Sequence, residues 1–483
     1  MVISRGEQGH DADDRSHPMM GLIRFSVALL AQIAFCAALN LYDDWTLEEM
    51  PEKFVMTGLL CGLAYLIAVR SFPTELSRRV QRTLFWAVVI ILRLVALPLE
   101  PSDDFWRYQW EGKIQQAGFN PYVTAPNDPA LEKVRADFPA WHKINHRDFR
   151  AIYPPGAELI FAGLSRVSGS PLFYKLLFAA ADVATIALLL RLLRDSAGDH
   201  REPLLPDDGQ RPPLQDYAKA AWYAWNPLVV YSFAGSAHFD SLMILPTVAG
   251  ILCLIRFEGE TASRRKWWLA VAASAAFGIA ISIKLVPALL LLCCVFALGY
   301  RAIALALSAA LPLGLSLLYG YPSVPIWESL RRFAHVTRLN DLFWWVIEET
   351  VWPNPHQKNY HYNVIIIVAV VVVSLIAFWN WKRAMLWALG VALILSPVLH
   401  PWYCTWILPL ATWRRAHAWH VLSITLFAYF LFWNERLFLL PWRSEPWLRA
   451  IIAVPPLAAG LWLALRPQPP RADNWDQSPV DPA

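Results

Sequence analysis

Two adjacent carboxylates, Asp103 and Asp104, follow directly after an apolar run, residues 84–99, of the kind that crosses a membrane. A charge at the end of a membrane helix is costly unless it is solvated or used, so the pair is a candidate site. A carboxylate there can take a proton from a hydroxyl while the hydroxyl oxygen attacks a carbon, which is general-base chemistry. The structural alternative is a charge pair that ends one helix, or an N-cap for the next. The spacing alone favours neither the catalytic nor the structural interpretation of the pair.

The carboxylate pair opens a polar loop, residues 100–153, in a chain otherwise made of apolar runs. Loops of that length are usually either functional or disordered, and the many Trp, Tyr and Phe residues here predict an ordered one. Arg107 lies one helical turn after Asp104, so it either keeps the carboxylate ionised or binds an anionic group itself. Tyr108 and Glu111 lie in the same stretch.

A second polar group, Gly235–Asp240, joins two apolar runs on the side predicted for Asp104. His238 in this group either serves a site or is satisfied by a neighbouring carbonyl, and Asp240 is also a plausible N-cap. Lys284 stands alone in apolar sequence, where a lysine is a functional hypothesis by default. Its alternative is snorkelling to the membrane surface. A phosphate would suit its compact positive charge.

A third group surrounds His400, which lies between Pro397 and Pro401. Prolines there break the helices and expose backbone groups that only a cavity tolerates, so His400 is a site candidate. Tyr403 follows and is also a typical interface anchor. Arg331 and Arg338 lie in a second outer loop, where the orientation rule disfavours basic residues. Either they bind a lipid phosphate or they belong to a solvated amphipathic helix.

The composition predicts the elements that must position these groups. The chain has 483 residues, of which 57% are hydrophobic and only 17% charged, and its mean hydropathy is +0.36. Soluble domains carry about 25% charged residues, so the composition favours an all-α polytopic membrane protein. A net charge of +4 indicates no nucleic-acid partner, and the six cysteines show neither metal-site nor disulfide spacing.

The predicted transmembrane domain covers residues 22–466, between a cytoplasmic tail, 1–21, and a disordered tail, 467–483. We expect about 12–14 spans, from apolar runs near 22–42, 54–71, 83–99, 171–193, 218–235, 239–257, 267–283, 285–299, 302–319, 363–380, 384–399, 401–413, 418–433 and 447–465. Basic residues after the second and sixth runs orient the chain: Arg78, Arg79, Arg82, Arg264, Arg265 and Lys266.

This orientation places both termini in the cytoplasm and puts the outer loops, 100–153 and 320–362, on the same outer face. Residues 154–167 are either a short crossing or a partly embedded helix, and the parity of the crossings favours the second. The polar piece 195–216 is predicted to be a cytoplasmic linker.

Several motifs between residues 84 and 410 are similar to those of one family when they are taken together. They are Asp104-Phe-Trp-Arg107-Tyr108-Gln-Trp110-Glu111-Gly112, Gly118-Phe-Asn120-Pro121-Tyr122, Tyr153-Pro154-Pro155, Asn226-Pro227, Gly235-Ser-Ala-His238-Phe-Asp240, Lys284-Leu-Val-Pro287 and His400-Pro401-Trp402-Tyr403. The chain resembles bacterial membrane glycosyltransferases of the C superfamily (GT-C). The nearest group is the polyprenyl-phosphate-mannose-type alpha-mannosyltransferases, often placed with glycosyltransferase family 87.

The resemblance implies a GT-C-like helical bundle with short helices in its long extracytoplasmic loop. It also implies transfer of a sugar, with inversion, from a polyprenyl-phosphate carrier to a lipid or glycan acceptor at the inner membrane of a bacterium. The essential acid of such enzymes lies in the first large outer loop, shortly before a Tyr-like aromatic, which Asp104 and Tyr108 match. One departure is that this loop follows the third apolar run here and the first in the core fold.

Residue chemistry and resemblance together give a set of expected roles. The general base is Asp104, with Asp103 as the alternative; the donor phosphate contacts Arg107, Lys284, Arg331, Arg338 and His400; the substrates contact Tyr108, Glu111, His238, Asp240 and Tyr403. No cofactor is expected, and no Gly-rich nucleotide loop is present, in agreement with a lipid-linked donor. A divalent metal between Asp103 and Asp104 is compatible with the sequence but not required. The rival function is a lipid or solute transporter or flippase.

Overall fold

The structure is a computed structural model that describes residues 11–47, 49–197, 216–356, 358–432 and 446–465. Three predicted polar segments lie partly or wholly outside the described residues. They are residues 1–10 of the N-terminal tail, residues 198–215 of the linker and the tail 467–483. No β-sheet occurs within the described ranges, so the prediction of an all-α membrane protein is confirmed.

The first half of the chain contains long helices and the short helices of the first outer loop. They are α1 (Asp11–Ala38), η1 (Leu39–Leu41), α2 (Met50–Arg70), α3 (Arg78–Ala96), α4 (Asp103–Gln116), η2 (Pro129–Leu131), α5 (Glu132–Ala136), η3 (Pro139–Lys143), α6 (Pro155–Val167), α7 (Pro171–Ala197), α8 (Asp216–Ala224), α9 (Pro227–Val230) and the π-helical turn η4 (Tyr231–Gly235).

The second half repeats this alternation of long and short helices. Its elements are α10 (Ser241–Gly259), α11 (Ser263–Ile283), η5 (Val286–Leu290), α12 (Leu291–Leu298), η6 (Gly299–Leu305), α13 (Ala306–Leu317), α14 (Glu328–Val336), α15 (Trp344–Thr350), α16 (Tyr360–Leu375), α17 (Ala377–Ile394), η7 (Pro401–Trp406), α18 (Leu408–Arg414), α19 (Ala418–Thr425), η8 (Leu426–Leu431) and α21 (Pro446–Leu465).

Seven helical stretches of the described residues are long and apolar enough to cross a membrane. They are Met19–Leu41, Met50–Arg70, Pro171–Ser196, Ser241–Gly259, Ser263–Ile283, Val286–Leu317 and Pro446–Leu465. The other predicted apolar runs also contain helix, but in shorter or more polar pieces. The number of crossings, expected to be about 12–14, therefore stays a prediction.

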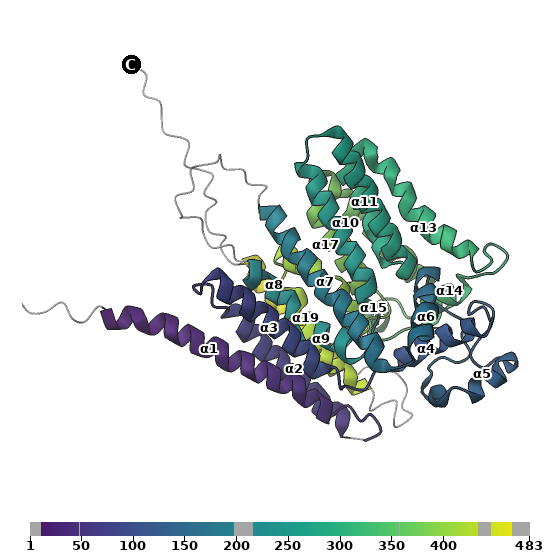
Figure 1. Cartoon of the computed structure of the whole chain (residues 1–483), viewed down its shortest axis with the longest axis horizontal. Helices are drawn as coiled ribbons and strands as arrows, with labels where there is room; N and C mark the ends of the chain where they lie inside the picture. Colours follow the sequence, from purple (N-terminus) through teal and green to yellow (C-terminus); the bar gives the residue numbers. More distant parts are fainter. Residues whose placement is uncertain (1–10, 48, 198–215, 357, 433–445, 466–483) are drawn as a thin grey trace, which may run out of the picture.

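The long helices form one bundle, and the short helices α4, α5 and α6 gather at one end of it, near α14 (Figure 1). Within the bundle α1 packs against α2, and α10 packs against both α7 and α11. At the loop end α4 packs closely against α6, because Gly112 lets the backbones meet: a Cβ there would lie 2.3 Å from the Phe161 carbonyl oxygen. The 13 residues of α6 extend about 20 Å, less than the roughly 30 Å needed to cross, which favours the partly embedded alternative.

The two outer loops contact each other. Arg150 of the first loop pairs with Glu328 of the second at 3.8 Å, and the Arg332 guanidinium lies 4.6 Å from the centroid of the Phe149 ring. The first loop also has its own apolar core around the fully buried Trp110. The loops thus lie at the same end of the bundle, as predicted, and its extracytoplasmic orientation stays a prediction.

Three interrupted segments converge at this end of the bundle. After α9, Ala237 adopts a left-handed conformation (φ +62°), and the Ser236 carbonyl accepts a 2.9 Å hydrogen bond from the Ser102 amide, which fixes the start of α4. The helix α11 ends because Lys284 is extended (φ −154°) and Pro287 follows. After α17, the extended stretch before His400 pairs with the second outer loop through a bridge between Val398 and Leu339. These breaks bring distant polar residues together.

Candidate active site

Asp104 lies in the first turn of α4, with 21% of its side chain exposed. Asn145, from the far end of the first outer loop, donates to its Oδ1 over 2.9 Å. The other oxygen, Oδ2, lies 3.8 Å from Nδ1 of His238, which is a contact rather than a hydrogen bond. Burial, and next the neighbouring Asp103 carboxylate, raise the pKa of Asp104 to about 7, while Asn145 and Lys284 oppose the rise. A carboxyl group with this pKa exchanges a proton readily near neutral pH.

Asp240 and Lys284 form an ion pair next to Asp104. Their Nζ–Oδ1 distance is 2.5 Å, and the Trp406 indole also donates to that oxygen over 2.6 Å. The second oxygen of Asp240 is buried and has no hydrogen-bond partner among the described residues. The Lys284 ammonium lies about 5 Å from three ring centroids, those of Phe239, Tyr403 and Trp406. The ammonium is thus held by one carboxylate and by rings, while its side chain stays 15% exposed.

Two histidines, His238 and His400, stack on one indole, that of Trp402. The Trp402 ring lies 3.8 Å from the His238 ring and 4.3 Å from the His400 ring, centroid to centroid, both nearly parallel. His400 Nδ1 contacts the Tyr429 hydroxyl at 3.1 Å. Burial, followed by the nearby Lys284 charge, lowers the pKa of His238 and lowers that of His400 to about 3. Both imidazoles are therefore neutral at physiological pH, and neither neutralises Asp104.

A cluster of four aromatic rings packs next to this site. Tyr108, one turn after Asp104, stacks on Phe161 of α6 at 4.8 Å, and its ring meets Phe239 edge to face at 5.0 Å. Tyr153 completes the group through edge contacts with all three rings. Burial raises the pKa of the Tyr108 hydroxyl well above its usual value, so it stays protonated. Tyr108 thus fixes the α4 backbone beneath Asp104.

Six predicted site residues therefore converge around Asp104: Asp103, His238, Asp240, Lys284, His400 and Tyr403. His238 contacts Asp104, Lys284 pairs with Asp240, and the Tyr403 ring lies 5.1 Å from the Lys284 ammonium. These contacts place the charged groups in one site.

Arg107 and Glu111 lie elsewhere on α4. The Arg107 guanidinium pairs with Glu111 at 2.6 Å and donates to the carbonyls of His146 and Phe149 over 3.0 and 2.6 Å. The predicted turn-mate of Asp104 thus holds the loop segment that carries Asn145. Glu158 of α6, which is fully buried, interacts with Glu111, and this raises the pKa of Glu158 beyond the effect of burial alone.

The arginines of the second outer loop are also placed away from the Asp104 cluster. Arg338 pairs with Asp341 at 3.0 Å and with Glu348. Arg331 is exposed on α14, and within the described part of the chain no contact joins it to the cluster. A role of these residues toward the donor phosphate stays a prediction.

Sequence reasoning missed Asn145 and Trp406, which both bind a site carboxylate. Asn145 had no distinguishing neighbour in the loop. Trp406 lies six residues after His400, and its indole N–H, a donor without an acceptor function, was a signal that it needs a partner when buried. Trp406 also lines a narrow crevice of 20 Å³. The crevice is enclosed by apolar groups of α10, η5, α17 and α18, among them Val248, Pro287, Leu389 and Leu410.

Metal binding has limited support from the geometry. Within the described ranges, no group of three or more His, Cys, Asp or Glu side chains is placed to hold a metal ion. A metal held by Asp103 and Asp104 would therefore take its other ligands from water or substrate.

The family comparison decides the class of protein. The model of the MptA_B family, described as alpha-(1->6)-mannopyranosyltransferase, N-terminal domain, matches residues 25–300, more than half of the chain. The chain belongs to this family. The resemblance to GT87-like alpha-mannosyltransferases is thereby confirmed. The protein is an integral, multi-pass membrane glycosyltransferase, which implies a sugar donor, an acceptor and membrane lipids as its partners. No curated protein and no solved structure matches the chain.

Proposed function

We propose that this glycosyltransferase moves a hexose, mannose in the first instance, from a polyprenyl-phosphate carrier to a hydroxyl of a lipid or glycan acceptor. The reaction takes place at the extracytoplasmic face of the inner membrane of a bacterium. The observation that carries the proposal is the Asp104 carboxyl, whose pKa is raised to about 7, next to the Asp240–Lys284 pair at the loop end of the bundle. A base, a cation and an aromatic enclosure are what such a transfer requires.

The proposed mechanism is a single displacement. Asp104 accepts the proton of the acceptor hydroxyl as that oxygen forms a bond to the anomeric carbon of the sugar. The bond from this carbon to the phosphate oxygen breaks, its electron pair leaves with the carrier phosphate, and the anomeric configuration inverts. Asn145 binds the ionised form of Asp104 and so positions the oxygen that receives the proton.

Lys284 is the proposed ligand of the leaving phosphate. An ammonium has three N–H donors, and one of them is engaged by Asp240. The remaining donors can meet a phosphate oxygen, and the neutral histidines add no competing charge. The aromatic surroundings lower the local dielectric constant and strengthen this interaction as negative charge develops.

The apolar crevice next to Trp406 supports a lipid-linked donor. Trp406 donates a hydrogen bond to Asp240 and also lines the crevice. The proposed phosphate site at Lys284 therefore lies next to an apolar surface. Because the crevice is only 20 Å³, a prenyl chain enters by displacing side chains between α10 and α17.

The test uses the full-length protein in proteoliposomes with polyprenyl-phosphate mannose and a short α-mannoside acceptor. We expect transfer that requires the carrier-linked sugar and a product of inverted anomeric configuration by NMR. Transfer from a nucleotide sugar but not from the carrier-linked sugar contradicts the proposal that the donor is a polyprenyl-phosphate sugar. Movement of the intact carrier across the bilayer without transfer favours the transporter alternative.

A further inference from the structure

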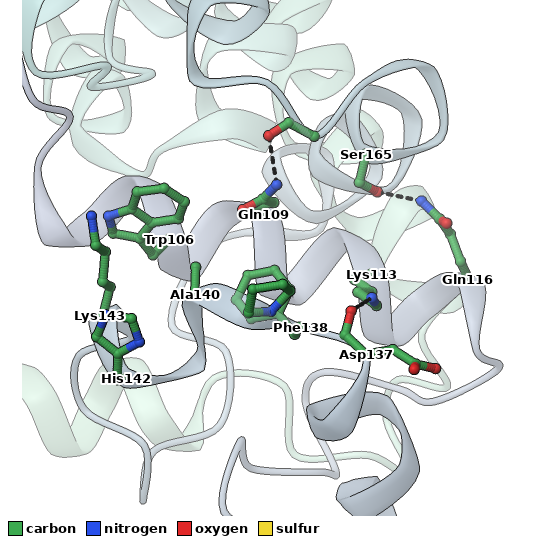
Figure 2. Close-up of a pocket in the computed structure, with 12 residues that line it drawn as sticks. Trp106, Gln109, Lys113, Gln116, Asp137, Phe138, Ala140, His142, Lys143 and Ser165 are labelled. Carbon is green, nitrogen blue, oxygen red and sulfur yellow. Dashed lines mark hydrogen bonds between the residues drawn. The ribbon is translucent and has the colours of Figure 1, made fainter.

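A second cavity, of 610 Å³, opens beside α4 in the first outer loop. Figure 2 shows that its walls are one face of α4, the segment from Phe138 to Lys143, and the end of α6 at Ser165. The volume falls within the range of about 300–1,000 Å³ that is typical of small-molecule sites. The proposed transfer site does not use this cavity.

The cavity and the Asp104 site lie on opposite faces of the same helix. The α4 residues that line the cavity, Trp106, Gln109, Lys113 and Gln116, are spaced by three, four and three residues, which places them on one face. At about 100° per residue, this face points away from Asp104. It extends about 15 Å along the helix, enough for more than one ring of a ligand.

The α4 face presents one flat ring and two amides. The Gln109 amide nitrogen donates to the Gly169 carbonyl over 2.6 Å, and its carbonyl oxygen is buried without a partner among the described residues. The Gln116 amide nitrogen donates to the Ser165 hydroxyl over 2.6 Å. Amides offer both a donor and an acceptor, as hydroxyl ligands do, and Trp106 offers an apolar surface with a polar edge. These groups suit a ligand with an apolar face and a rim of hydroxyls.

The two lysines of the cavity already have partners. The Lys113 ammonium donates to the Asp137 carbonyl. The Lys143 ammonium pairs with Glu100 at 2.7 Å and lies 4.8 Å from the Trp106 ring centroid. Because both lysines have partners, the cavity favours a neutral polar ligand over an anionic headgroup.

We propose that this cavity binds a saccharide segment of the acceptor glycan, several sugar units away from the hydroxyl that reacts. The inference rests on the proposed function, since it takes the acceptor to be a glycan. A sugar ring stacks one C–H face on Trp106 while its hydroxyls pair with the exposed amide of Gln116. The position on the far face of α4 makes the cavity a subsite for chain length, separate from the chemistry at Asp104.

The test measures binding without turnover, by isothermal titration of the purified full-length protein with α-(1→6)-linked mannotetraose and with mannobiose. We expect the tetraose to bind more tightly than the biose. Trp106→Leu keeps apolar packing but removes the flat ring, and it should weaken tetraose binding about tenfold. Gln116→Leu, at an exposed position, should weaken it severalfold. The matched control is Trp141→Leu, because Trp141 is half-buried in the same loop but packs on Trp110 outside the cavity.

Several outcomes overturn the inference. Tetraose affinity unchanged in both Trp106→Leu and Gln116→Leu excludes the cavity, and so does an equal loss in Trp141→Leu. Binding of inorganic phosphate in place of tetraose also contradicts a neutral ligand. The proposed function can fail separately. If tetraose binding depends on Trp106 but no mannose is transferred from polyprenyl-phosphate mannose, the saccharide site is supported and the proposed donor is wrong.

Discussion

The ion pairs Arg93–Asp182 and Asp240–Lys284 are both largely buried, and they differ in how completely their polar atoms are satisfied. In the first pair, Arg93 of α3 binds Asp182 of α7 at 2.6 Å, and Tyr223 donates to the other Asp182 oxygen over 2.9 Å. The same guanidinium also donates to the Ala224 carbonyl over 2.5 Å. Both carboxylate oxygens have partners, and the side chains are at most 5% exposed.

The second pair, Asp240 and Lys284, leaves one carboxylate oxygen without a partner among the described residues and keeps its lysine 15% exposed. It also lies near a carboxyl group that exchanges a proton near pH 7. The same charge chemistry therefore serves two purposes. The Arg93–Asp182 pair, whose carboxylate oxygens both have partners, holds α3, α7 and α8 together. The Asp240–Lys284 pair, which is only partly satisfied and lies next to a base, can bind a ligand.

Breaking the Arg93–Asp182 pair is expected to have the largest effect. Arg93→Met leaves Asp182 buried without its counter-charge, which typically costs about 3–5 kcal/mol. We expect a loss of folded protein, measured by the thermal midpoint and by the yield of monodisperse protein. The double variant Arg93→Met/Asp182→Leu removes both charges and should recover much of the stability and the transfer activity. A single variant as stable as the wild type contradicts a structural role.

Breaking the Asp240–Lys284 pair should reduce activity more than stability. Lys284→Met keeps the length but removes the charge, and hydrogen bonds to charged groups are worth about 1.5–3 kcal/mol, so transfer at subsaturating donor should fall about 10- to 100-fold with a raised KM for the carrier. The matched double variant Lys284→Met/Asp240→Asn should not regain activity, in contrast to the Arg93 double variant. An unchanged rate at subsaturating donor contradicts phosphate binding by Lys284 and favours the alternative that its side chain only extends to the membrane surface.

The smallest expected effect is a shift of the pH profile. A general base acts in its ionised form, so kcat/KM should rise with pH through the Asp104 pKa of about 7. Asn145→Ala removes a hydrogen bond that lowers this pKa, so the rising limb should move to higher pH. Asp103→Asn removes a charge that raises it, so the limb should move to lower pH. Shifts in the same direction for both variants contradict the assignment.

The sequence predicted the all-α membrane fold, and it picked out several residues that the structure brings together, because both depend on local signals. Long apolar runs identified the membrane helices, and Lys284 and Asp240 stood out as charges in apolar surroundings. The partner of Arg107 could not be read from the sequence, because Asp104 and Glu111 both lie about one helical turn from it and the choice depends on the loop that packs there. Asn145 could not be recognised, since only the folded loop brings it to Asp104, 41 residues away. Arg93 and Asp182 likewise become a pair only through the packing of α3 on α7.

The most direct test of the central claim compares Asp104→Asn with the wild type in carrier-dependent mannosyl transfer. The amide is nearly isosteric with the carboxyl but cannot accept the proton, so the rate should fall about 10²–10⁴-fold in correctly inserted protein. Asp103→Asn should be much milder; comparable losses in both variants, with sensitivity to a chelator, indicate a shared metal. If Asp104→Asn retains transfer within about threefold of wild type, far less than a general base contributes, then Asp104 is not the base.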